Sequence, residues 1–111
     1  MKPYIRVYLD DDENNAFFGD GPCRLLHAIE ECGSLRGAAV SMGMAYTKAL
    51  SILKKAEQVL NFSLTEKTIG GKGGGGSHLT TEAKEFLEKY EAYRDACLTA
   101  NQQLYLEIFS K

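Results

Sequence analysis

The apolar positions near the N-terminus alternate with polar ones, whereas those further along the chain recur every three or four residues. Residues 4–9 place Ile, Val and Leu on one side and Tyr and Arg on the other, which is the period of a half-buried strand. A polar turn over residues 11–15 and a short apolar run over 16–18 follow. The pattern predicts an N-terminal β-hairpin within residues 1–18.

The three-to-four-residue period first predicts a helix over about residues 20–32. Asp20 is a candidate N-cap, Pro22 suits the first turn, and Gly33 can adopt the left-handed conformation that ends a helix. The helix has one apolar stripe, which should face the core and consists of Leu25, Leu26, Ile29 and Cys32.

Residues 34–60 predict a short helix, a tight turn and a longer helix. Ser34 is a suitable N-cap, Gly43 can make the turn, and the second helix starts at Met44 or Ala45. This is the spacing of a DNA-binding helix-turn-helix. A helical hairpin inside an ordinary core is the alternative, but it leaves the outward face of the second helix unexplained. That face carries no acid and consists of Thr47, Lys48, Ser51, Lys54, Lys55 and Gln58.

Residues 62–79 predict two strands joined by a glycine-rich tip over 70–77, and so turn the motif into a winged helix. Lys72 is suited to a phosphate contact because its glycine neighbours have no Cβ to obstruct close approach. A passive linker is the alternative. The glycine run is not a dinucleotide fingerprint, since no βαβ unit surrounds it, and it is not a phosphate loop, since Gly73 follows Lys72.

The final helix, predicted over residues 80–111 with Thr80 or Thr81 as its cap, has a seven-residue apolar repeat. At 1.5 Å per residue it would reach roughly 45 Å, longer than the roughly 35 Å diameter of a domain of this size. Part of it must therefore protrude, and a second copy of the chain is expected to cover the protruding apolar stripe. The expected dimer interface consists of Phe86, Tyr90, Tyr93, Cys97, Ala100, Leu104 and Ile108.

The length and the charge distribution are consistent with a single domain that binds nucleic acid through one surface. The 111 residues suffice for one core, and the formal net charge is −2. Residues 34–78, however, hold six Lys and Arg against two Glu, a local net charge of +4. No signal peptide or membrane span is visible, and three cysteines cannot all pair within one chain, so a cytoplasmic location is expected.

No catalytic, metal-binding or cofactor-binding residues are assigned from the sequence. Cys23 and His27 lie four residues apart on one predicted helix, but no third or fourth metal ligand is evident, so a buried thiol and a surface histidine are the favoured interpretation. The acidic turn resembles the start of a calcium loop but lacks its glycine and its closing glutamate. No nucleophile lies in a recognisable motif, and the chain is not expected to be an enzyme.

Two stretches carry a resemblance to a known family: GSLRGAAVSMGMAYTKALSILKKAEQ and LTEKTIGGKGGGGSHLTTEAKEFLEKY. They resemble the N-terminal winged-helix domain of the ModE family of molybdate-responsive transcriptional regulators, which are of bacterial type. The helix-turn-helix part is also similar to that of LysR-type regulators. Where the family usually has Ser before the tyrosine and two Arg after it, this chain has Ala45, Thr47 and Lys48. Molybdate binding is not expected for this chain alone, because the family's oxyanion-binding domain is a separate C-terminal one.

The pattern and the resemblance together predict a homodimeric, sequence-specific regulator of transcription that binds double-stranded DNA through the helix over 44–60 and the wing. The alternative is a winged-helix module that binds another protein through its long C-terminal helix. No membrane partner is expected. The expected DNA-binding residues are Ser34, Arg36, Tyr46, Thr47, Lys48, Ser51, Lys54, Lys55 and Lys72.

Overall fold

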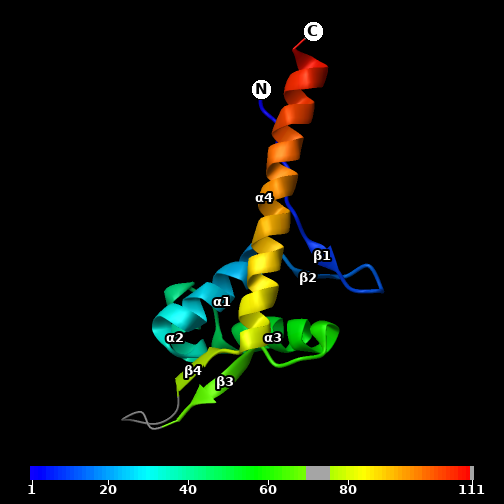
Figure 1. Ribbon diagram of the computed structural model, residues 1–111. Coiled ribbons are helices and arrows are strands. Elements are labelled where there is room, and N and C mark those ends of the chain that lie inside the picture. Colours follow the sequence, from blue (N-terminus) through cyan, green and yellow to red (C-terminus); the bar gives the residue numbers. More distant parts are fainter. Residues whose placement is uncertain (70–75, 111) are drawn as a thin grey trace.

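The structure, a computed structural model that describes residues 1–69 and 76–110, contains a small helical head and one long protruding helix (Figure 1). Its extents are 62 × 28 × 25 Å. The elements run in the order β1 (Leu9–Asp10), β2 (Ala16–Phe18), α1 (Asp20–Cys32), α2 (Leu35–Ser41), α3 (Tyr46–Leu60), β3 (Thr65–Thr68), β4 (Gly76–Leu79) and α4 (Thr81–Phe109). This confirms the expected winged helix-turn-helix, a mainly helical fold with two small antiparallel hairpins.

The helix ends lie close to where local chemistry predicts them, with two exceptions: α3 begins at Tyr46 and not at Met44 or Ala45, and Asp20 does not cap α1. The Ser34 hydroxyl accepts a hydrogen bond from the Gly37 amide (2.9 Å) and so caps α2, while Gly33 ends α1 with a φ of 74°. Asp20 is not the cap of α1: it is the first helical residue, and its carboxylate pairs with Arg24 at 3.0 Å. A carboxylate in the first turn of a helix is stabilised by the positive end of the helix dipole.

The N-terminal hairpin is shorter than predicted. β1 comprises only Leu9 and Asp10, and residues 1–8, which we call the arm, lie along α4 instead of pairing with β2 (Figure 1). The Tyr90 hydroxyl donates to the Val7 carbonyl (2.8 Å), and the Tyr105 hydroxyl donates to the Met1 carbonyl (3.0 Å). The alternating pattern correctly indicated an extended segment, but the partner of that segment is a helix more than eighty residues away in sequence.

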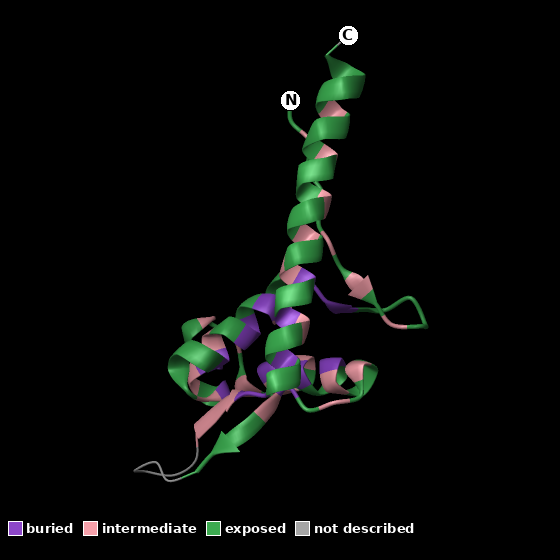
Figure 2. Cartoon of the chain, viewed as in Figure 1, coloured by how far each residue is buried: buried purple, intermediate pink, exposed green. Residues whose placement is uncertain are grey.

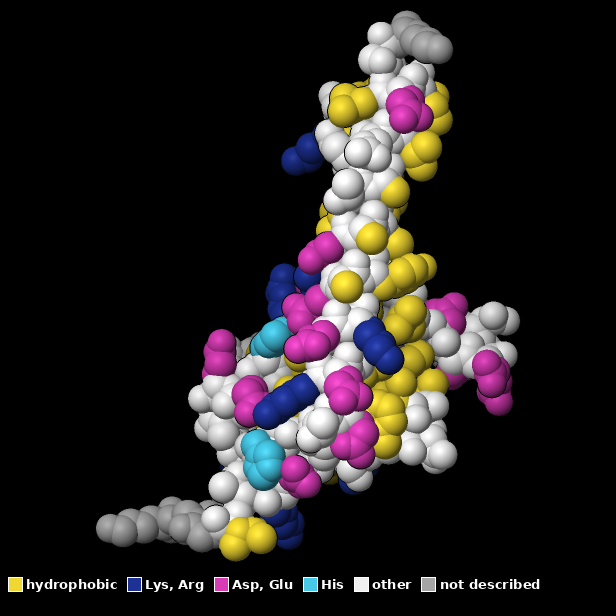
Figure 3. Space-filling model, in the orientation of Figure 1, with side chains coloured by type: hydrophobic (Ala, Val, Ile, Leu, Met, Phe, Trp, Pro, Cys, Tyr) yellow, Lys and Arg dark blue, Asp and Glu magenta, His cyan; other side chains and the backbone are white. Residues whose placement is uncertain are grey.

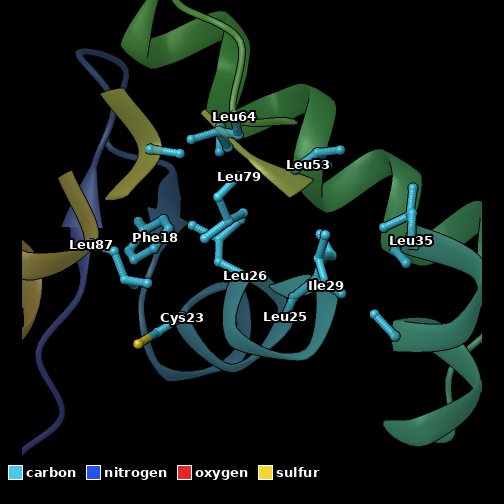
Figure 4. Packing of buried hydrophobic residues seen from close by; sticks show 14 of the residues in the cluster. Phe18, Cys23, Leu25, Leu26, Ile29, Leu35, Leu53, Leu64, Leu79 and Leu87 are labelled. Atoms are coloured by element: carbon cyan, nitrogen blue, oxygen red, sulfur yellow. The ribbon is translucent and has the colours of Figure 1, made fainter. Parts of the chain in front are cut away.

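The core lies where α1 meets the other helices and the first turns of α4 (Figures 2 and 4). Leu25, Leu26 and Ile29 of α1 are almost completely buried, as the predicted stripe requires, whereas Cys32 is exposed. Phe18 contacts Phe86 and Tyr90 edge to face, with ring centroids 4.8 and 4.9 Å apart. These aromatic contacts hold the first three turns of α4 against the head.

Beyond the head, α4 continues with the arm along one side, and we call residues 93–109 the stalk. The buried positions of α4 are confined to its first three turns, and its upper turns are mostly exposed (Figure 2). Hydrophobic side chains follow the stalk in Figure 3. Tyr93, Leu104 and Ile108 of the stalk are each more than half exposed. The expected protrusion is therefore confirmed. Within the described residues, no helix is both long and apolar enough to cross a membrane.

Candidate nucleic-acid interface

The turn between α2 and α3 fixes the angle at which α3 leaves the head. Gly43 has a φ of 66°, and the Met44 amide donates to the Ala39 carbonyl at 3.0 Å. Ala38, Ala39 and Ala49 are buried where the two helices meet, so small side chains permit the close approach. Ala45 precedes α3 without a side-chain cap, as its chemistry requires. The helix-turn-helix geometry expected from the spacing is present.

The first turns of α3 present an exposed polar surface. Thr47, Lys48 and Ser51 are exposed, while Ala49 and Leu53 face the core. Glu57, an acidic residue on this helix, is turned away: its carboxylate accepts a hydrogen bond from the Leu64 amide (2.8 Å). The exposed face of α3 therefore has no carboxylate that would repel a phosphate. We call Thr47, Lys48 and Ser51 the α3 tip.

Arg36 connects the start of α2 to the start of α3. Its guanidinium lies over the Tyr46 ring, 4.4 Å from the centroid, and Tyr46 is half-buried. Such stacking holds the arginine by one face and leaves its N–H groups free to donate to an oxyanion. Together with the Ser34 cap, this contact places the start of α2 beside the α3 tip.

The second half of α3 is less suited to phosphates. Lys54 lies 3.5 Å from Glu57, and Lys55 donates to the Ala16 carbonyl at 3.2 Å. Lys55 also shares a hollow with the acidic residues 10–13 of the hairpin turn. Backbone hydrogen bonds from Asn15 and Glu13 hold the pKa of the Asp11 carboxyl below its usual range, so the turn keeps its negative charge. The usable basic surface is concentrated at the first half of α3.

The wing is anchored to the head at its base. The Ser77 amide donates to the Gly33 carbonyl (2.7 Å), and a Cβ on Gly76 would lie only 2.6 Å from that same oxygen. Glycine is therefore required at position 76 for this contact. The Gly-rich tip at 70–75, including Lys72, lies outside the described residues. Lys67 on β3 is an exposed cation that the sequence analysis did not select, although its strand position could have indicated it.

The residues expected at the dimer interface fall into two groups. Phe86 and Tyr90 pack against Phe18 in the chain's own core, and burial raises the pKa of the Tyr90 hydroxyl. Their assignment to a dimer interface is corrected: the seven-residue repeat is continuous in sequence, but its first half covers the head of the same chain. The remaining members lie on the stalk and are exposed or half-buried: Tyr93, Cys97, Ala100, Leu104 and Ile108.

Comparison with known proteins confirms the resemblance to ModE proteins. The chain is 44% identical over 63 residues to the molybdenum transport protein ModE of Herbaspirillum seropedicae, which covers 57% of this chain and 23% of that protein. It is 32% identical over 87 residues to the ModE protein of Azotobacter vinelandii, covering 78% and 32%. With the DNA-binding transcriptional dual regulator ModE of Escherichia coli, the identity is 33% over 67 residues, covering 60% and 26%. No family profile matches.

The chain thus spans about a quarter to a third of the length of these relatives. Among solved structures, ArgP from Mycobacterium tuberculosis is similar, with a TM-score of 0.52 and 22% sequence identity over 79% of this chain and 31% of that one. At this identity the similarity concerns the fold, and it supports the winged helix-turn-helix described above.

Proposed function

We propose that this chain binds double-stranded DNA and regulates transcription, with the α3 tip in the major groove. The observation that carries the proposal is the exposed start of α3, which is free of carboxylates and held at a fixed angle by a helix-turn-helix turn. Recognition helices of this motif contact base edges with their N-terminal residues. The names of the relatives, which include transcriptional regulators, support the same function.

Within this proposal, the residues divide into two roles. Thr47, Lys48 and Ser51 read base edges, because buried Ala49 and Leu53 fix the helix beneath them. Ser34 and Arg36 bind phosphates and so position the protein on the duplex, because they lie at the start of α2 and not on the helix that enters the groove. Tyr46 acts by holding Arg36. Lys72, chosen from the sequence, adds a phosphate contact. Lys54, which pairs with Glu57, and Lys55, which is engaged with the hairpin, lie at the margin of the interface.

We further propose that two copies pair through the stalk. Tyr93, Leu104 and Ile108 expose more than half of their surface, which is costly in water for a row of apolar side chains. The arm lies along the stalk, and Leu104 and Ile108 line a hollow together with arm residues 1–4, so the second copy covers these side chains beside the edge of the arm. Two heads at a fixed distance would then contact two half-sites of one operator, as dimeric helix-turn-helix proteins do.

Enrichment of bound duplexes from a random-sequence DNA pool tests the function. We expect one enriched motif, and we expect the chain to prefer it over a shuffled duplex in gel-shift assays at low and at high salt. Absence of any duplex binding at low salt would contradict the proposal. The exposed apolar stalk would then favour the second candidate, a module that binds another protein through α4.

A further inference from the structure

Three potential metal ligands from two helices meet beside the root of the stalk. Cys23 and His27 lie one turn apart on α1, and Glu91 faces them from α4; the Sγ atom, a histidine nitrogen and a carboxylate oxygen all lie within 4.8 Å of one another. His27 Nε2 and Glu91 Oε2 are already 3.2 Å apart. The sequence could show Cys23 and His27 but not the third member, because 64 residues separate Glu91 from His27.

The spacing fits one small cation. Ligand atoms on a tetrahedral zinc lie about 3.5 Å apart, given metal–ligand bonds of about 2.0–2.3 Å. The His27–Glu91 pair already meets this separation, and the thiol needs to approach by about 1 Å. Cys23 is 3% exposed and lies at the Phe18 and Leu87 end of the packed cluster (Figure 4). The His27 side chain is half exposed, so an ion can enter from the solvent side.

We propose that Cys23, His27 and Glu91 bind a divalent transition-metal ion of the zinc class, with a water molecule in the fourth position. Thiolate, imidazole and carboxylate together form a ligand set between hard and soft, which favours zinc-like ions over magnesium or calcium, since these prefer oxygen ligands alone. The bound thiolate and carboxylate carry two negative charges and neutralise the ion. The ion ties α1 to α4 at the point where the stalk leaves the head.

Two features of the surroundings set how tightly the ion binds. Burial raises the pKa of the Cys23 thiol, so at neutral pH the ion displaces one proton from the sulfur on binding. Arg94 is the competing cation: its guanidinium lies 3.9 Å from Cys23 Sγ and 3.8 Å from Glu91. Arg94 also donates a hydrogen bond to Asp95 at 3.0 Å. It can keep this bond when the ion replaces its guanidinium beside Cys23 and Glu91.

Titration of the tag-free full chain with Co²⁺, a coloured substitute for Zn²⁺, tests the proposal. We expect one ion per chain, with a thiolate-to-cobalt charge-transfer band and the visible bands of a tetrahedral site, both displaced by Zn²⁺. Cys23→Ser should remove the charge-transfer band, whereas Cys32→Ser, which changes an exposed thiol on the same helix, should leave the spectrum unchanged.

Two further variants keep the test independent of folding defects at the buried cysteine. Glu91→Gln, at a position one-third exposed, should weaken Co²⁺ binding at least tenfold, and Arg94→Met should strengthen it by removing the competing cation. The proposal is overturned if no Co²⁺ binds at micromolar concentration, if Glu91→Gln binds as tightly as the parent chain, or if the charge-transfer band survives in Cys23→Ser.

Discussion

Single residues at the ends of helices determine much of this fold, and they are the part that sequence predicts best. A cap or a left-handed turn depends on one side chain and its nearest amides, so Ser34, Gly33 and Gly43 could be interpreted without knowledge of the tertiary structure. The ligand role of Glu91 could not, because its neighbours come from a helix far away in sequence. The same holds for Phe86 and Tyr90, whose partner is Phe18.

Thr80 illustrates how much a single capping residue contributes. It is buried, its hydroxyl accepts from the Ala83 amide (3.1 Å), and it donates to the Ser63 carbonyl (2.7 Å). Thr80→Ala removes both bonds and should lower the free energy of unfolding by about 1–3 kcal/mol in urea denaturation. Thr81→Ala, at the exposed neighbouring position, should change it by less than about 0.5 kcal/mol. Equal losses in the two variants would show that the cap is not what stabilises this junction.

At the scale of elements, periodicity predicted each helix and the inward stripe of α1, but not which surface the repeat of α4 covers. The repeat along α4 looks uniform in sequence, yet its first half covers the head, whereas its second half extends beyond the head and is largely exposed. The predicted strand at residues 4–9 is similar: the alternation indicated an extended segment, and the arm is extended, but hydroxyl groups of α4 bind its carbonyls. The local pattern of a segment predicts its conformation, whereas the partner it packs against depends on the other segments that could cover the same surface.

Dimerisation through the stalk is the prediction that belongs to this scale. Leu104→Glu places a charge in the proposed seam and should shift the chain from dimer to monomer in size-exclusion chromatography with light scattering at micromolar concentration. Gln102→Glu adds the same charge on the opposite side of the helix and should leave the dimer intact. A parent chain that is monomeric at these concentrations, or a dimer that Leu104→Glu does not weaken, would contradict the stalk as the interface.

At the scale of the whole molecule, the chain separates two surfaces with different charge. Acidic side chains lie where α4 leaves the head (Figure 3) and in the hairpin turn at residues 10–13, while Arg36 and Lys48 lie at the starts of α2 and α3. A net charge of −2 is therefore compatible with DNA binding, because the field near the phosphates depends on where the charges lie. The sequence predicted this separation from the basic stretch 34–78 but not the position of Lys55 beside the acidic turn.

The most direct test of the account compares Lys48→Ala with Lys89→Ala, an exposed lysine on α4, on the enriched duplex and on random duplex DNA. If the α3 tip reads bases, Lys48→Ala should lose about 1–3 kcal/mol on the enriched duplex, roughly a 5- to 150-fold weaker Kd, and much less on random DNA. Lys89→Ala should bind both duplexes like the parent chain. A Lys48→Ala variant that keeps its full preference for the enriched duplex would contradict the assignment of α3 as the recognition helix.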